Sequence, residues 1–471
     1  MATIISRLII EHYRSVRYLE LEPASLCALI GPNNAGKTNI LRAINLIMGN
    51  GGPLPLATQD YSDGDISRPV SVKLFFAAPL YCRQDGSSVW GLRYLSPPIR
   101  ATGEVPNPQL ACLDKEGKVV VSDQDDHELF LQVRSQVPFL FIDARRSFLN
   151  DGLEDHWKAL RKLLERLGGI DGEARFLLET ESLTADIDRE GGETVVSGPG
   201  RQSSLLVEAL KAVKDADNAG AVIAIEEPEI FLHPHRERFF YRILRGLSMA
   251  GNQVIYATHS SNFVDIQYPE DVFLVRRKLG AGTVVRHNFK STWSSDERFM
   301  LLREFDSRRN ELFFSRGVVL VEGDTERFLY PPFLQSQGID IDEIEISIVD
   351  AGGKGNMPLL VEVLEFFDIP YVAIFDSDMH PGKRRKRTDV LLRLRQQGGP
   401  NARLIAASRS PERLFVFEPH IEGALGFNPE MKDKVVSAVQ YVQNGVSSQA
   451  RCRLMEPINA LLAQIREKEL Q

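Results

Sequence analysis

An apolar run, a glycine-rich turn and a helical pattern follow one another over residues 26–48, and this succession constrains the fold more than any other feature. The turn reads GPNNAGKT, from Gly31 to Thr38, and matches the spacing G-x-x-x-x-G-K-[ST]. Glycines let backbone N–H groups surround phosphate oxygens, while Lys37 would contact the β- and γ-phosphates and the Thr38 hydroxyl would bind Mg²⁺. A chance match would lack the flanking strand and helix. The segment therefore predicts a nucleotide-binding α/β domain.

Two further apolar runs, AVIAIEEPE and NQVIYATHS, also end in polar turns, which indicates a largely parallel sheet. The first run would deliver Glu226 and Glu227 to one sheet edge. One carboxylate can hold Mg²⁺ through water, and the next can orient and deprotonate the attacking water. Adjacent acids could mark only a surface turn, but the phosphate loop argues against that. His259 ends the second run, where an imidazole could contact a γ-phosphate, although His259 alone would more often be structural.

A second α/β pattern in the last third of the chain also ends its strands in acids. VVLVEGDTE ends in Glu322, Asp324 and Glu326, and YVAIFDSD ends in Asp376 and Asp378. The carboxyl ends of parallel strands meet at one edge of a sheet, so these side chains can converge. Clustered carboxylates repel each other unless cations bind, and oxygen ligands suit Mg²⁺ or Mn²⁺. Two such ions about 4 Å apart can promote phosphodiester hydrolysis. A charged rim above an ordinary sheet is the structural alternative.

A run of basic residues follows the Asp376/Asp378 pair, although the chain carries a formal net charge of −8. Residues 383–409 contain many lysine and arginine residues but a single acid, Asp389. Such a run is usually a solvated surface, but its position beside the acids favours contact with a nucleic-acid backbone. The expected DNA-binding residues are Lys383, Arg384, Arg385, Lys386 and Arg387.

The composition bounds the class of protein. With 43% hydrophobic and 25% charged residues the chain is an ordinary globular protein, and 471 residues allow two domains. No apolar stretch approaches the roughly 20 residues of a membrane span, and the N-terminus alternates like a strand rather than a signal peptide. The four cysteines have no ligand or disulfide spacing, so we expect a cytoplasmic protein with no membrane partner. We expect domains over residues 1–310, with a helical insertion at about 150–190, and over residues 311–471.

The first domain resembles the ATP-binding-cassette ATPases, in the branch shared by RecF, SMC and OLD proteins. GPNNAGKTN is similar to the phosphate loop of that branch, VVSGPGRQSS to its signature segment, and IEEPEIFLHP to its Walker B and D-loop region. His259 matches the switch histidine. Glu226 stands where many of these ATPases have Asp, and Gln59 is only a weak match to the Q-loop. The resemblance implies that ATP is bound by Asn34, Gly36, Lys37, Thr38, Ser197, Gly198 and Glu226.

The second domain resembles the Toprim domain of topoisomerases, primases and OLD nucleases. On this resemblance Glu322 and the Asp376/Asp378 pair bind metal, with Glu326 a further ligand as in OLD enzymes. FVFEPHIEGAL is similar to the later acidic motif of that family, which implies Glu418 as a ligand and Glu422 as an alternative. The glycine-rich DAGGKGN places Asp350 or Lys354 within reach, and the late lysine of the family corresponds to Lys432 or Lys434.

Both resemblances in this order match the OLD family, which includes the nuclease subunit of Gabija-type phage defence. The family implies an ATPase-coupled, metal-dependent DNA endonuclease or nickase that works with a partner defence protein. It also implies ATP with one Mg²⁺, and two Mg²⁺ or Mn²⁺ ions at the Toprim site. Because the signature segment usually completes the ATP site of a second subunit, we expect a homodimer or higher homo-oligomer. The alternatives are a repair ATPase or defence sensor whose Toprim domain does not cut and, less favoured, a primase-like polymerase.

Overall fold

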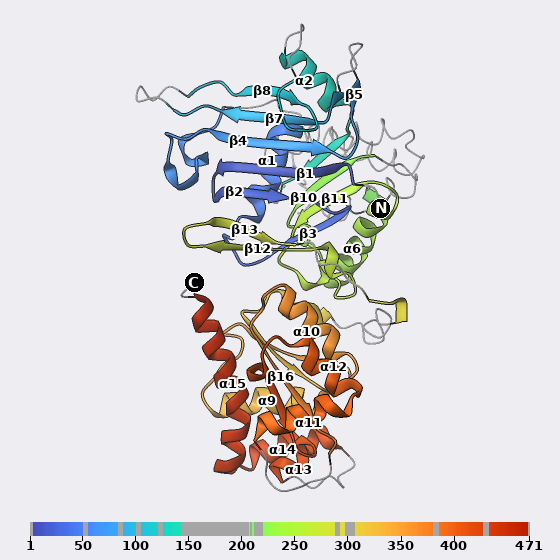
Figure 1. Cartoon of the computed structure of the whole chain (residues 1–471), viewed down its shortest axis with the longest axis vertical. Helices are drawn as coiled ribbons and strands as arrows, with labels where there is room; N and C mark the ends of the chain where they lie inside the picture. Colours follow the sequence, from blue (N-terminus) through green and yellow to red (C-terminus); the bar gives the residue numbers. More distant parts are fainter. Residues whose placement is uncertain are drawn as a thin grey trace, which may run out of the picture. The chain divides into compact units, whose positions relative to one another are not determined.

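The computed structural model describes residues 3–49, 55–82, 88–99, 105–120, 126–143, 207, 210–211, 220–287, 293–296, 307–379, 386–426 and 433–469 (Figure 1). The chain forms two compact units. Unit 1 comprises Met1–Val264 and Glu270–Asn288, and unit 2 comprises Asp265–Pro269 and Phe289–Gln471. The expected domain limits at residue 310 stay a prediction, and the expected insertion at 150–190 lies outside the described residues. No helix among the described residues could cross a membrane.

Unit 1 is built on one eleven-stranded mixed sheet. Its parallel half holds, in order, β12 (Val272–Lys278), β3 (Leu26–Ile30), β11 (Gln253–Ala257), β10 (Val222–Glu226) and β9 (Phe139–Ile142). The other half is antiparallel, so a largely parallel sheet was the wrong expectation for the unit as a whole. Its strands are β8 (Gln109–Leu113), β7 (Gly91–Ser96), β4 (Val70–Phe76), β1 (Ile5–Tyr13), β2 (Val16–Leu21) and β13 (Gly282–Arg286).

The three apolar runs that end in polar turns are the central parallel strands β3, β11 and β10, and every residue in them is buried. Strands covered on both faces need apolar side chains at successive positions, which explains why these runs do not alternate. Among the described residues, the helices of the unit include α1 (Lys37–Met48), α2 (Asp126–Ser135) and α6 (Pro234–Met249), and β5 (Tyr81–Cys82) pairs with β6 (Ser88–Val89). Helix α1 buries Ile40, Leu41, Ile44 and Ile47 in the core.

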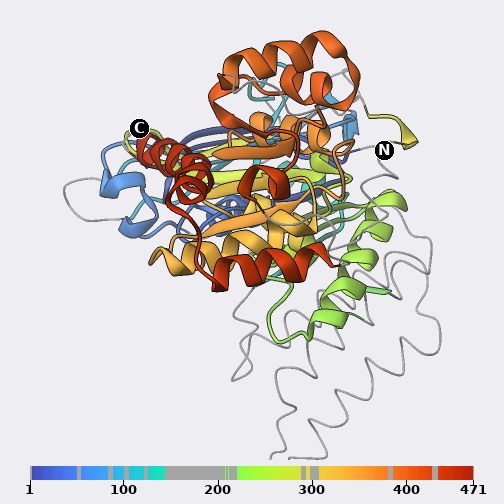
Figure 2. The same ribbon diagram turned by 90° about the horizontal axis from the view of Figure 1, so that it is seen from below.

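Unit 2 is built on a four-stranded parallel sheet in the order β15 (Ile346–Asp350), β14 (Gly317–Val321), β16 (Tyr371–Asp376) and β17 (Leu414–Phe417). Its helices are α8 (Ser307–Asn310), α9 (Asp324–Ser336), α10 (Met357–Phe366), α11 (Arg387–Gln397), α12 (Gly399–Ala407), α13 (Ile421–Leu425), α14 (Lys434–Gln443) and α15 (Ser448–Glu469). Figure 2 shows α11 and α12 on one side of this sheet and α9 with α14 on the other.

The order of these strands positions the acids. Because the sheet of unit 2 is parallel and β14 lies directly beside β16, the ends of both strands reach the same edge. Val319 and Val321 of β14 pack with Val372 and Ile374 of β16 in one apolar core, which fixes the register of the two strands. The expected α/β fold class, with a second α/β domain towards the C-terminus, is confirmed.

Candidate functional site

The phosphate loop connects β3 to α1 and depends on residues that accept a left-handed backbone. Gly31, Asn34 and Gly36 have φ values of 141°, 63° and 107°. A Cβ atom on Gly36 would lie 2.1 Å from Oγ1 of Thr283, a buried side chain that itself donates to the carbonyl of Ala35. Only glycine fits there, so the glycine of the motif is required by backbone geometry and by the approach of β13.

The ammonium of Lys37 lies inside this loop. Its Nζ donates to the carbonyl oxygens of Gly31, at 2.7 Å, and Pro32, at 3.0 Å. Burial lowers the pKa of Lys37 to about 8, and the nearby Glu227 and Glu229 carboxylates oppose that change. A partly desolvated cation held by two neutral carbonyls is poised to bind an anion. Thr38, half-buried, follows it in the first turn of α1.

The adjacent acids at the end of β10 have different surroundings. Glu226 is the last residue of the strand and is 2% exposed, with its Oε1 3.2 Å from Nε of Arg42 on α1. Arg42 also lies 3.6 Å from Asp143, after β9. Glu227 has a left-handed backbone, with φ at 45°, and its N–H donates to the carbonyl of Ala257 on β11. Arg42 is a contact that the sequence analysis missed.

A third acid of the same turn, Glu229, holds the backbone at His259 in place through hydrogen bonds. Its Oε1 accepts the backbone N–H of His259 at 2.6 Å, and its Oε2 accepts the hydroxyl of Thr258 at 2.8 Å. Burial raises the pKa of Glu229. Burial, followed by the positive charge of Lys37, lowers the pKa of His259. The structure thus brings Lys37, Glu229 and His259 into one electrostatic neighbourhood, and the sequence analysis missed Glu229 although it is part of EEPE.

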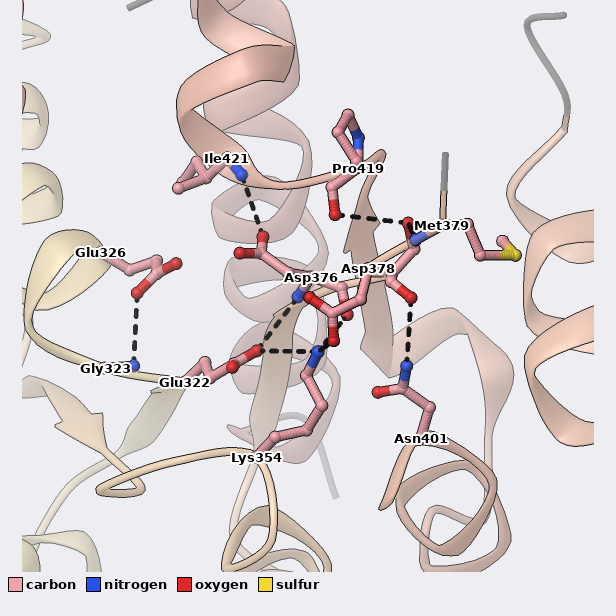
Figure 3. A network of polar contacts seen from close by, with 11 residues as sticks. Glu322, Gly323, Glu326, Lys354, Asp376, Asp378, Met379, Asn401, Pro419 and Ile421 are labelled. Atoms are coloured by element: carbon pink, nitrogen blue, oxygen red, sulfur yellow. Dashed lines mark hydrogen bonds and ion pairs between the residues drawn. The ribbon is translucent and has the colours of Figure 1, made fainter. Parts of the chain in front are cut away.

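Four acids of unit 2 converge: Glu322, Glu326, Asp376 and Glu422. Figure 3 shows the first three of them. Glu322 follows β14, and its Oε2 accepts the backbone N–H of Asp376 at 3.3 Å. Asp376 ends β16, and its Oδ1 accepts the N–H of Ile421 at 2.9 Å. Glu326 lies in the first turn of α9, 4% exposed, and accepts the N–H of Gly323 at 3.3 Å.

Burial and mutual repulsion change the proton affinity of these carboxyls. Burial first, then the charges of Glu326, Glu322 and Glu422, raises the pKa of Asp376 to about 8. Burial also raises the pKa of Glu326 to about 7, with Glu322 and Glu422 adding to the effect. Such acids are costly to keep ionised unless a cation neutralises them, and that cost is typical of a functional centre.

The later acidic motif contributes Glu422 to this neighbourhood. Glu422 lies in the first turn of α13, 4% exposed, with its Oε1 2.9 Å from Nζ of Lys434 and its Oε2 3.0 Å from Nδ1 of His420. Burial would raise the pKa of Glu422, but Lys434 and His420 hold it below its ordinary value. Glu418, half-buried, follows β17 directly and stays a predicted ligand. Of the two late lysines, Lys432 lies outside the described residues.

Asp378 differs from the other acids because its side chain is 71% exposed. Its backbone is left-handed, with φ at 54°, and its N–H donates to the carbonyl of Pro419 at 3.0 Å. Its carboxylate pairs with the ammonium of Lys354. Asp350 lies at the end of β15, where it pairs with Arg309 at 3.0 Å and Arg327 at 2.9 Å.

The donor set of unit 2 fits a divalent cation in its chemistry. Its members are hard oxygen donors, and the raised pKa values of Asp376 and Glu326 show that positive charge would stabilise them. Among the residues that the structure describes, however, no three His, Cys, Asp or Glu side chains are already arranged as a metal site. Binding of metal would therefore require these side chains to move.

Several predicted residues are not brought to either site. Gln59 is exposed in a short 3₁₀ helix, Thr58–Asp60. Lys386 is exposed before α11, whereas Arg387 lies 3.2 Å from Glu456 and over the ring of Phe415. The remaining predicted ATP and DNA contacts lie outside the described residues; these are Ser197, Gly198, Lys383, Arg384 and Arg385.

Two family models match parts of the chain. Residues 313–378 match the family model for the "Overcoming lysogenization defect protein-like, TOPRIM domain". Residues 203–265 match the model described as "AAA domain, putative AbiEii toxin, Type IV TA system".

Three curated relatives carry nuclease names. The OLD nuclease of Thermus scotoductus is 28% identical over 91% of this chain and 93% of its own length. The Old nuclease of Escherichia phage P2 is 28% identical over 42% of this chain and 35% of its own. Endonuclease GajA of Bacillus cereus is 24% identical over 35% of this chain and 27% of its own. The chain therefore carries an ATPase domain followed by an OLD-like Toprim domain, and it resembles an OLD nuclease over most of its length.

Proposed function

We propose that this protein is an ATP-binding and ATP-hydrolysing, divalent-metal-dependent DNA endonuclease or nickase that acts in antiphage defence. The observation that carries the proposal is the position of Asp376, whose carboxylate faces three other acids at the carboxyl edge of the sheet. The nuclease names of the three relatives support DNA as the substrate.

In the ATPase domain, Lys37 would bind the nucleotide phosphates, and Thr38 and Glu226 would hold one Mg²⁺. Glu227 would orient and deprotonate the attacking water. His259 would contact the γ-phosphate, and the hydrogen bond from its backbone to Glu229 supports that role because it fixes the loop. Ser197 and Gly198 of a second copy would complete the site, so the active protein would be a homodimer or higher homo-oligomer.

In the Toprim domain, the carboxylates at the edge of the sheet would hold two Mg²⁺ or Mn²⁺ ions. The ligands would be Glu322, Glu326, Asp376 and Asp378, with Glu418 or Glu422. Bound ions of this kind supply activation of water and stabilisation of the leaving oxygen. The chain itself holds Asp376 in place through the N–H of Ile421 and retains Glu322 beside it through the N–H of Asp376.

The basic run after Asp378 would contact the DNA backbone. Phosphate contacts from Lys383, Arg384, Arg385, Lys386 and Arg387 would give binding that tolerates sequence changes and weakens as salt increases. ATP turnover would control access of DNA to the Toprim centre. We further propose a cytoplasmic location and a partner defence protein, following the family resemblance.

The test is an agarose-gel assay on supercoiled plasmid with Mg²⁺ or Mn²⁺, with and without ATP. Wild type should produce nicked or linear DNA, and Asp376→Asn should not. Asp368→Asn is the matched control, because Asp368 lies just before the start of β16, roughly 20 Å from the end of the strand at which Asp376 lies. Asparagine also tolerates the φ of 54° at this position. Lys37→Ala shows how ATP controls cleavage. Cleavage by Asp376→Asn equal to that of wild type would overturn the proposed nuclease centre.

A second candidate is an ATPase sensor whose Toprim domain binds DNA or a partner without cutting. The observation that favours it is that the acids are not already arranged as a metal site in the described residues. Intact plasmid in every lane, together with ATP hydrolysis that changes when phage components are added, would support this second function.

A further inference from the structure

A lysine on a glycine-rich loop lies between two of the acids at the Toprim centre. The loop follows β15 and contains Gly352 and Gly353, with φ values of 64° and 115°. The N–H of Gly353 donates to the carbonyl of Glu322 at 2.9 Å, and the buried Asn356 amide donates to the carbonyl of Ala351 at 2.9 Å. Because hydrogen bonds hold both ends of the loop, the position of the lysine between them is built into the fold.

The ammonium of this residue, Lys354, makes three contacts (Figure 3). Its Nζ donates to the carbonyl oxygen of Asp376 at 2.8 Å, lies 3.5 Å from Oε2 of Glu322 and pairs with Oδ2 of Asp378. The side chain of Lys354 is only 12% exposed. One cation thus joins the acids that follow β14 and β16, where a divalent ion would also have to bind.

We propose that Lys354 is a positioning residue that serves as the internal counter-ion of the Toprim centre in the absence of metal, and that a divalent cation binds by displacing it. This inference rests on the proposed function, because it requires that Glu322 and Asp378 bind metal. The ammonium keeps two repelling carboxylates together while no metal is bound, and it lowers the affinity of the centre for metal.

The geometry explains how displacement can occur. An ammonium only donates hydrogen bonds, so it competes with a metal ion for the same carboxylate oxygens. Asp378 is largely exposed and can turn towards a new cation, whereas Asp376 is held by the N–H of Ile421. The contact of Lys354 with the carbonyl of Asp376 does not involve a carboxylate, so it can persist and keep the displaced lysine close to the centre.

The test is calorimetric titration of the nucleotide-free full-length protein with Mn²⁺, alongside thermal melting in EDTA and in Mn²⁺. Lys354→Met keeps the length of the side chain and removes the charge. We expect it to bind Mn²⁺ roughly two- to fivefold more tightly, the factor that corresponds to losing one partly exposed ion pair. Its melting temperature should be lower than that of wild type in EDTA and rise more on adding Mn²⁺. Lys354→Arg, which keeps the charge, should stay close to wild type.

Lys468→Met is the matched control, because it breaks a lysine–aspartate pair with Asp368 at the opposite end of β16. It should leave Mn²⁺ affinity unchanged. Weaker or unchanged Mn²⁺ binding by Lys354→Met, with binding by wild type intact, would overturn the counter-ion role alone. If wild type binds no Mn²⁺, or if Asp376→Asn binds Mn²⁺ as tightly as wild type, both this inference and the proposed metal centre would be overturned.

Discussion

The carboxyl group of Asp376 should make unit 2 less stable as the pH rises, and replacing it by asparagine should remove that effect. Burial, followed by repulsion from Glu326, Glu322 and Glu422, raises the pKa of Asp376 from 3.8 to about 8. A carboxyl whose pKa is higher in the folded than in the unfolded chain binds its proton more tightly when folded. The free energy of unfolding of unit 2 should therefore fall between about pH 4 and about pH 8.

The size of the effect follows from the same values. At about 1.4 kcal/mol for each pKa unit, a single group rising from 3.8 to about 8 would destabilise the fold by at most ~6 kcal/mol above pH 8. We expect about 2–4 kcal/mol, because protonation of Glu326 relieves part of the same repulsion and Asp376 is only half-buried. Asp376→Asn keeps an Oδ1 acceptor for the N–H of Ile421, so it isolates the effect of charge.

Hydrogen exchange of peptides that cover β14 and β16 measures this locally, since a chain with two units need not unfold in one step. In EDTA at pH 8.5, Asp376→Asn should be roughly 30- to 700-fold more protected than wild type, after correction for the intrinsic exchange rate. The difference should shrink towards pH 5, and Asp368→Asn should not reproduce it. A difference independent of pH, or a less protected Asn variant at pH 8.5, would refute the reasoning.

Three substitutions test the ATPase domain. Lys37→Met should abolish binding of a fluorescent ATP analogue, because it removes the cation inside the phosphate loop; retained binding would contradict its assignment. Glu229→Gln should lower steady-state ATP turnover roughly tenfold at nearly unchanged ATP affinity, because a neutral acceptor holds the His259 N–H more weakly; normal turnover would argue against this role. Gly36→Ala should destabilise unit 1 by roughly 2–4 kcal/mol, because its Cβ would meet Thr283 at a φ of 107°; an unchanged melting temperature would exclude the clash.

The sequence predicts the parts of both sites that lie directly after buried strands. Glu226 and Glu322 follow continuous apolar runs, so periodicity gives both the strand and the edge at which the acid emerges. The same reasoning predicts Asp376 at the end of β16. The antiparallel half of the first sheet was not expected, because an apolar run indicates a buried strand but not the direction of the strand beside it.

The contacts that sequence reasoning missed come from tertiary packing. The hydrogen bond from His259 to Glu229 joins two turns thirty residues apart, and no local pattern specifies that pairing. Helix α13 has only five residues, too few for a helical period to indicate which face Glu422 presents. The family resemblance places Lys354 within reach of the site, but its glycine loop has no periodicity, so only the fold reveals its contact with Asp378.

The two domains place a buried carboxylate at the end of a parallel strand, and they neutralise it in different ways. Glu226 is almost fully buried and has a permanent cation in Arg42, which is fixed on the helix that follows the phosphate loop. Asp376 accepts a backbone N–H and faces three acids, and its pKa is raised. Two of these acids pair with lysines, Glu322 with Lys354 and Glu422 with Lys434. A divalent cation could displace such lysine side chains. Glu226 therefore has a counter-ion within the fold, whereas we propose that a divalent ion completes the charge balance of the Toprim centre.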